Sequence, residues 1–229
     1  MVRRTKEEAL VTRDRILDAA ELLFEKQGVS RTSLHDIAEA AGVTRGAVYW
    51  HFQDKADLFN AMMLRVLLPL EETLWHIDPA PDPMTGLRHC FMAALHKTVN
   101  DPQVRRVFSI ATHKVEYVDE LLAVRDRRLA TRDECVEEWQ RSFALAQRKG
   151  LVKLRMPPHA AAFGLHALID GLIRNWLLDP AAFDLVKLGQ QTLDTYLAGL
   201  ATEKSAKPAV VKTDAAKKRP ASRRVAAVA

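Results

Sequence analysis

The sequence predicts an all-α fold in which a small N-terminal helical domain precedes a larger helical one. Apolar residues recur at spacings of three and four along most of the chain, which is the period of an amphipathic helix. Sustained alternation of β-branched and polar residues, the mark of a half-buried strand, does not occur. With 229 residues, 48% of them hydrophobic, the chain is long enough to bury a sizeable core.

The first two helices are marked by their ends. An arm over residues 1–13 leads into RDRILDAAELLFEKQG, whose apolar stripe predicts a helix that stops at Gly28. In RTSLHDIAEAAG, Ser33 can cap a second helix, and Asp36 three residues later completes a capping box. Gly42 can take the left-handed conformation that ends this helix after about eight residues.

Two more helices follow directly. Thr44 can cap a short third helix, and Asp54 can start a fourth one that runs to about Leu74. Pro69 should kink or break the fourth helix, because proline removes a backbone hydrogen bond. The three prolines within residues 79–83 then predict a loop.

The C-terminal part is expected to contain five further helical stretches. We expect helices over residues 84–99, 102–112 and 115–149, and the third of these can be divided near Asp119. The last two stretches, residues 157–180 and 181–201, begin with prolines or with an acidic cap. After Ala201 the chain consists mainly of Ala, Lys, Pro, Val and Arg without periodicity, which predicts a disordered tail.

The net charge of +5 comes from this tail. From Glu203 onward there are eight basic and two acidic residues, so residues 1–202 carry about −1. Residues 1–65 are balanced, with ten of each sign, but residues 42–53 contain no acid. Such a local asymmetry is what a surface that faces a phosphate backbone requires.

The compartment can be inferred from cysteines and hydropathy. Cys90 and Cys135 lie in amphipathic stretches without the spacing of a zinc site or a disulfide framework. The N-terminus has no apolar signal-peptide region, and no run approaches the roughly 18 apolar residues of a membrane span. We expect a cytoplasmic protein without a cofactor, a bound metal or a membrane partner.

The second and third predicted helices have the spacing of a helix-turn-helix unit. Apolar side chains of the third helix are assigned to the core: Val43, Val48 and Phe52. The remaining side chains then face outward: Thr44, Arg45, Tyr49, and Trp50 or His51. The bulk of Trp50 favours burial, so we expect this side chain in the core, with the outer face as the alternative. Arg45 can pair with guanine, and Lys55 beside a helix N-terminus can bind a phosphate.

At this point a family resemblance becomes clear. Residues 15–62, RILDAAELLFEKQGVSRTSLHDIAEAAGVTRGAVYWHFQDKADLFNAM, resemble the DNA-binding region of the TetR family of bacterial repressors. The stretches MVRRTKEEA, GVTRGAVYWHF, HKVEY and IDGLIRNWLL further resemble the multidrug-efflux repressors of the AcrR and TtgR type. The resemblance implies a homodimer that represses transcription and leaves its operator when a hydrophobic or aromatic inducer, such as an antibiotic or biocide, binds. A dimer also predicts a pseudo-palindromic double-stranded DNA operator.

The resemblance and the local pattern together divide the chain. We expect the arm and the helix-turn-helix domain over residues 1–55, a ligand-binding and dimerisation domain over 56–201, and the basic tail over 202–229. The candidate DNA-contacting residues are Arg3, Arg4, Ser33, Thr44, Arg45, Gly46, Tyr49, Trp50, His51 and Lys55. The tail either adds salt-sensitive DNA affinity or only keeps the protein in solution.

Matching of motifs to the efflux repressors also implies a ligand pocket. Its candidate lining residues are Cys90, Ala94, Phe108, Thr112, Cys135, Trp139, Leu165, His166, Ile169, Asp170, Ile173 and Trp176. Asp170 is notable because a carboxylate in an apolar stretch is costly unless it is paired, for example with Arg174, or faces a ligand.

The last two predicted helices carry the candidate dimer interface. Their apolar spacing predicts a four-helix contact between two chains through Leu165, Leu168, Leu172, Leu185, Leu188, Thr192, Tyr196 and Leu200.

Two alternative functions compete with this interpretation. A regulator of the same fold could sense a metabolite or an acyl thioester instead of a drug, and the N-terminal half cannot distinguish the two. A helical enzyme is disfavoured, because its best support is the single pair His113 and Glu116 at (i, i+3) spacing, and a di-metal carboxylate site needs two such pairs.

Overall fold

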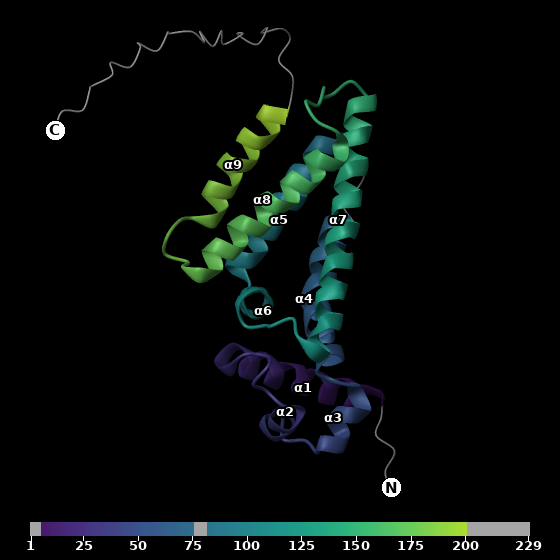
Figure 1. The fold of residues 1–229 in the computed structure, drawn as a ribbon, viewed down its shortest axis with the longest axis vertical. Coiled ribbons are helices and arrows are strands. Elements are labelled where there is room, and N and C mark those ends of the chain that lie inside the picture. The colour runs from purple at the N-terminus through teal and green to yellow at the C-terminus, as the bar shows by residue number, and fades with distance from the viewer. Residues whose placement is uncertain (1–5, 76–81, 201–229) are drawn as a thin grey trace, which may run out of the picture.

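The computed structural model describes residues 6–75 and 82–200, and within these ranges the side chains outside 68–75 and position 120. The described residues form α-helices and one short 3-10 helix, and they contain no strand. The helices α1 to α3 lie together at one end of the molecule, and α5, α8 and α9 pack at the other end (Figure 1). The long helices α4 and α7 extend between the two ends (Figure 1). The all-α prediction is confirmed.

Helix α1 spans Lys6–Gln27 and so begins inside the segment that the sequence assigned to an arm. Glu7 and Glu8 lie in its first turn, where carboxylates favour the positive end of the helix dipole. At its other end Gly28 has φ +85°, as expected of a glycine that ends a helix.

Helix α2 spans Leu34–Ala40, and its predicted capping box is present. The Asp36 N–H donates to Ser33 Oγ at 3.1 Å, and the Ser33 N–H donates to the Asp36 carboxylate at 2.9 Å. These hydrogen bonds lower the pKa of Asp36. Gly42 follows with φ +62°, and an added Cβ there would lie 3.2 Å from Arg15 Nη2, so the tight turn favours glycine.

Helices α3 and α4 also begin where the sequence predicts. Helix α3 spans Arg45–His51, and Thr44 Oγ1 accepts the Ala47 N–H at 3.1 Å. Helix α4 spans Lys55–Trp75, and the Asp54 carboxylate accepts the Asp57 N–H at 2.7 Å. Because α4 continues past Pro69, the predicted break at this proline is wrong, and the kink stays a prediction.

The remaining helices are α5 (Pro83–Asn100), α6 (Pro102–His113), the 3-10 helix η1 (Asp119–Leu121), α7 (Leu122–Arg148), α8 (Pro158–Leu178) and α9 (Leu185–Leu200). The expected helix over residues 115–149 is therefore divided, as its alternative stated, and α7 starts at residue 122. The Asp184 carboxylate accepts the Lys187 N–H at 2.9 Å and so provides the predicted acidic cap of α9. The predicted proline loop over 79–83 and the tail lie largely or wholly outside the described residues.

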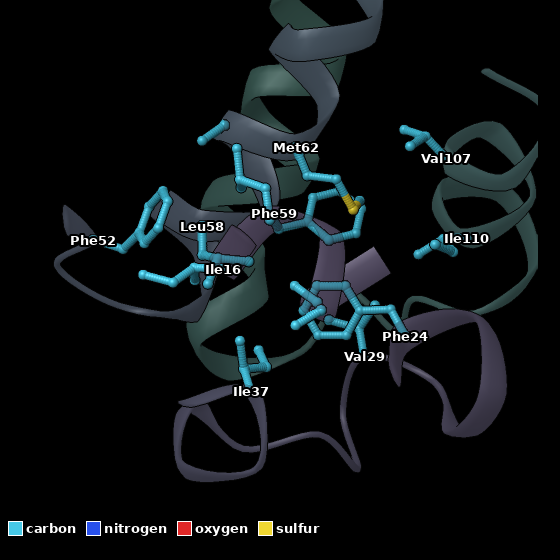
Figure 2. Packing of buried hydrophobic residues seen from close by; sticks show 14 of the residues in the cluster. Ile16, Phe24, Val29, Ile37, Phe52, Leu58, Phe59, Met62, Val107 and Ile110 are labelled. Carbon is cyan, nitrogen blue, oxygen red and sulfur yellow. The ribbon is translucent and has the colours of Figure 1, made fainter. Parts of the chain in front are cut away.

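The buried apolar side chains form two clusters. The first cluster joins α1, α2, α3 and α4 to Val107 and Ile110 of α6, which Figure 2 shows facing Phe24 and Phe59. The second cluster joins α5, α7, α8 and α9. Helix α6 therefore packs directly against the core of the N-terminal helices, and a shift of α6 must be accommodated there because protein interiors are close-packed.

Candidate functional site

The outer face of α3 is exposed and polar, as predicted. Val48 and Phe52 are buried and Val43 is partly buried, so the apolar side chains point inward. On the other side Tyr49 is 47% exposed and Trp50 is 73% exposed. The expectation that bulk would bury Trp50 is therefore wrong: the ring packs edge-on against His51, 4.5 Å between centroids, on the surface of the helix.

Arg45 and Tyr49 form a pair on this face. The guanidinium lies 5.4 Å from the centre of the Tyr49 ring, and Nη2 donates to the Tyr49 hydroxyl at 3.2 Å. Gly46 is exposed beside them, and an added Cβ would meet only Thr44 Oγ1, at 3.9 Å. The missing side chain leaves room for the backbone of a ligand to approach α3 closely.

An open groove of about 570 Å³ lies next to this pair. It is lined by Ser33, Leu34, His35, Arg45, Tyr49, Gln53, Asp54 and Lys55. Four of these residues were candidates from the sequence, namely Ser33, Arg45, Tyr49 and Lys55. The first turn of α2 contributes Leu34 and His35, and the segment between α3 and α4 contributes Gln53 and Asp54. These four were not among the predicted residues, although His35 lies two positions after the Ser33 cap and could have been included.

The side chain of Lys55 is buried, whereas the sequence suggested a cation that is available to bind a phosphate. The residue is 8% exposed, and Nζ donates to the Thr32 carbonyl at 3.2 Å. The side chain therefore connects the start of α4 to the segment before α2, and it lines the groove rather than projecting from it. An ammonium held in this way can still add positive potential to the groove floor, since burial weakens screening by solvent.

Arg3 and Arg4 lie outside the described residues. Thr44 is exposed, and its hydroxyl accepts the cap hydrogen bond, so the hydroxyl proton remains available for an acceptor. His51 is half-buried at the end of α3.

The second set of candidates lies among α5, α7 and α8. The second apolar cluster brings together eight of them: Cys90, Ala94, Cys135, Trp139, Leu165, Ile169, Ile173 and Trp176. Phe108 packs instead against the first cluster, and Thr112 is a half-buried residue of α6. The structure therefore brings together most, but not all, of the residues predicted to line the ligand pocket.

Burial shifts two titratable groups in this region. It raises the pKa of the Cys90 thiol to about 11, although the neighbouring Trp139 side chain opposes the shift. It lowers the pKa of His166, whose ring centroid lies 6.2 Å from that of Trp139. Both groups are therefore uncharged near neutral pH, which suits a site for hydrophobic molecules.

Asp170 is paired. Its carboxylate accepts Arg174 Nε at 2.9 Å, and its second oxygen lies 3.6 Å from Arg128 Nη2. The predicted partner Arg174 is therefore found, and Arg128 of α7 is a second partner that sequence spacing could not indicate.

The predicted dimer seam faces largely inward. Leu165, Leu185 and Leu200 are 0–2% exposed and belong to the second cluster, so their assignment to a dimer interface is wrong. Leu168, Leu172 and Tyr196 pack partly against the same cluster, and Thr192 is half-buried. The large apolar side chains that α8 and α9 expose at their adjacent ends are Leu178, at 68%, and Leu188, at 37%.

The weak support for an enzyme is not strengthened. His113 ends α6 with Nε2 3.3 Å from the Arg174 carbonyl oxygen, and Glu116 lies beyond the helix, so the pair lacks its helical spacing. Among the described residues, His, Cys, Asp and Glu side chains form no group of three that could hold a metal ion. Within the same ranges, every helix is too short or too polar to cross a membrane.

Comparison with known proteins gives a consistent result. Residues 16–62 match the model of bacterial regulatory proteins of the tetR family. Residues 82–202 match the C-terminal region of MAATS-type transcriptional repressors. The chain is 41% identical over 203 residues to the HTH-type transcriptional regulator TtgR of Pseudomonas putida, covering 86% of this chain and 95% of TtgR.

Two solved structures are also similar. NalD, the secondary repressor of the MexAB-OprM multidrug efflux pump in Pseudomonas aeruginosa, superposes with a TM-score of 0.79 at 39% identity, covering 86% of this chain and 98% of NalD. A complex of SmeT with triclosan has a TM-score of 0.74 at 30% identity, covering 92% of this chain and 99% of SmeT. SmeT represses the multidrug efflux pump SmeDEF of Stenotrophomonas maltophilia.

Proposed function

The chain belongs to the TetR family of bacterial regulatory proteins, and we propose that it represses a multidrug efflux operon and leaves its operator when a hydrophobic or aromatic molecule binds its C-terminal helices. The main support for DNA binding is the exposed, polar face of α3, which borders the groove. Similarity to NalD and SmeT, which act on efflux pumps, supports the choice of operon.

The proposed DNA contacts follow from position. Helix α3 enters the major groove, where Arg45 can form a bidentate pair with guanine. Thr44, Tyr49 and His51 contact phosphates, as does the Ser33 hydroxyl at the start of α2. Trp50, exposed at the same face, adds contact area to the sugar-phosphate backbone. Arg3 and Arg4 belong to the proposed interface as a basic arm.

Lys55 acts from the floor of the groove. Because its ammonium is fixed by the Thr32 carbonyl, it positions the starts of α2 and α4 and attracts a phosphate to the N-terminus of α4.

The C-terminal helices provide the proposed inducer site and dimer contact. The uncharged Cys90 and His166 and the surrounding apolar side chains suit an aromatic ligand, and Asp170 offers one polar contact. The exposed leucines of α8 and α9 suit contact with a second copy, and two α3 helices in one dimer would contact successive turns of a pseudo-palindromic operator. We propose that this homodimer acts in the cytoplasm, where its operator lies.

An anisotropy titration tests the proposal. The purified full chain is titrated against the promoter region that flanks its own gene, together with Tyr49→Ala, Lys55→Ala and, as a control, Lys26→Ala at an exposed position of α1. We expect tight binding by the wild type and Lys26→Ala and weak binding by the other two. Failure of the folded wild-type dimer to bind at low salt would contradict the DNA-binding role.

Thermal shift tests the ligand part. A ligand selective for the folded state must raise its melting temperature. We expect a rise with an aromatic biocide such as triclosan and none with an acyl thioester, and the reverse result would favour a metabolite sensor.

A further inference from the structure

The guanidinium of Arg128, in α7, contacts the end of α6, the connection that follows α6, and α8. Nη1 donates to the Ala111 carbonyl at 2.6 Å and to the Tyr117 hydroxyl at 3.0 Å, and Nη2 lies 3.6 Å from Asp170. The Tyr117 hydroxyl in turn donates to the Ala111 carbonyl at 3.4 Å. Ala111 lies in the last turn of α6, Tyr117 in the connection to η1, and Asp170 in α8. We call these four residues the Arg128 cluster.

The end of α6 also contacts the N-terminal helices. Lys114 follows α6, and its carbonyl accepts the Val29 N–H at 2.9 Å. Val29 is fully buried in the first core cluster, between α1 and α2. Figure 2 shows Val29 beside Phe24, with Ile110 of α6 facing the same cluster. A change in the position of the α6 end therefore reaches the segment that leads into the helix-turn-helix unit.

Asp170 connects this cluster to the proposed inducer site. It lies one helical turn from His166, which packs against Trp139 in the second apolar cluster. A ligand can shift an equilibrium only through contacts that differ between two states. The 3.6 Å contact between Asp170 and Arg128 is a contact that a ligand at Asp170 can change.

We propose that Arg128 is the residue that couples inducer binding to the operator-binding helices. The proposal rests on the proposed function. Without inducer, Asp170 and Tyr117 hold the guanidinium on the Ala111 carbonyl and so fix the end of α6. An inducer that engages Asp170 withdraws the carboxylate from Arg128, and the end of α6, with Lys114 and its partner Val29, becomes free to shift.

Substitutions without any inducer test this coupling. Arg128→Gln removes the charge and should mimic the inducer, lowering operator affinity about 5- to 150-fold, the usual range of allosteric coupling. Asp170→Asn should act in the same direction. The double variant should lose little more than either single variant, because both break one contact.

Two matched controls isolate the contact. Arg132→Gln changes an arginine one turn further along α7 that pairs with Asp133. Arg174→Gln removes the other side-chain partner of Asp170. Arg174 contacts α6 only through its backbone carbonyl, 3.3 Å from His113 Nε2, and the substitution keeps that carbonyl. Both should bind the operator as the wild type does. Tyr117→Phe removes only the hydroxyl and should lower operator affinity less than Arg128→Gln does. This milder variant keeps the test decisive if Arg128→Gln fails to fold.

Hydrogen exchange gives a readout that needs no DNA. In Arg128→Gln and Tyr117→Phe, the Val29 amide should exchange faster than in the wild type and in Arg132→Gln. If the Val29 amide exchanges faster in the two cluster variants but the wild type binds no operator, the repressor function is overturned and the contact between the Arg128 cluster and Val29 is supported. Unchanged Val29 exchange in both cluster variants, together with wild-type operator affinity, would overturn the coupling itself.

Discussion

The guanidinium of Arg45 lies over the ring of Tyr49 and donates a hydrogen bond to its hydroxyl. The two residues are four apart on α3, so they project from one face of the helix. Both are exposed, and the stacked ring restricts the guanidinium to that face. Because a side chain that is already ordered loses less freedom on binding, the pair prepares Arg45 for contact with a base edge.

Tyr49→Phe tests this arrangement. The variant keeps the ring but removes the hydroxyl, and a hydrogen bond contributes about 0.5–1.5 kcal/mol net, so we expect operator affinity to fall about tenfold or less. Tyr49→Ala should lose more operator affinity, since it also removes the ring.

Both variants should also discriminate less against operators with substituted guanines. The loss should be smaller than in Arg45→Ala, where we expect about 1–3 kcal/mol of discrimination to disappear. Anisotropy at one fixed salt concentration measures all four proteins. Identical affinities of the wild type and Tyr49→Phe for every operator would contradict the role of the hydroxyl.

Glu21 should be important for stability. Its side chain is 2% exposed in α1, and its carboxylate contacts Arg65 of α4, Gln103 at 3.0 Å and Arg106 of α6 at 3.6 Å. Loss of one partner of a buried ion pair costs about 3–5 kcal/mol, and because both arginines are partly exposed we expect about 2–3 kcal/mol for Glu21→Ala. Urea unfolding measures the change.

Glu25→Ala is the matched control. Glu25 also pairs with Arg106, at 3.1 Å, but its side chain is 50% exposed, so the loss should be at most about 1 kcal/mol. Equal losses for the two variants would mean that burial of Glu21 adds nothing to the pair.

Local signals predicted the helix ends well. The Ser33 and Asp36 capping box, the Thr44 cap and the turn at Gly42 each depend on residues within a few positions, and all were found as expected. The start of α1 was misplaced, because residues 6–13 were assigned to the arm although Glu7 and Glu8 favour helix formation there.

The predictions that were wrong or absent concern contacts between residues that are distant in the sequence. Lys55 is held by the carbonyl of Thr32, which lies 23 positions earlier. Leu165, Leu185 and Leu200 are buried because α8 and α9 pack on helices of their own chain. An apolar helical stripe does not reveal whether its partner belongs to the same chain or to a second copy. The Arg128 cluster was not foreseen, because its four members lie on α6, on the connection to η1, on α7 and on α8.

A paired substitution tests the dimer surface. Leu178→Glu with Leu188→Glu places acids where the two exposed leucines of α8 and α9 would meet a second chain. Like charges brought together cost several kcal/mol, so we expect the dimer dissociation constant to rise about 100-fold or more. Light scattering on a sizing column measures the mass, and Leu145→Glu, at an exposed leucine of α7, should leave the dimer intact. A dimer that withstands the paired substitution would place the interface elsewhere.

His166 should make folding sensitive to pH. Burial lowers its pKa from 6.5, nearby Arg132 and Arg128 lower it further, and Asp170 opposes the shift. The unfolded chain therefore binds a proton more readily than the folded one, so stability falls as the pH drops through about 6.5 toward the lower pKa of the folded state. The melting temperature of the wild type should thus fall more between about pH 7.5 and 5.5 than that of His166→Asn. His159→Asn, at an exposed position of the same helix, controls for loss of any histidine. Parallel pH profiles of the wild type and His166→Asn would show that the folded protein accommodates the imidazolium at this position.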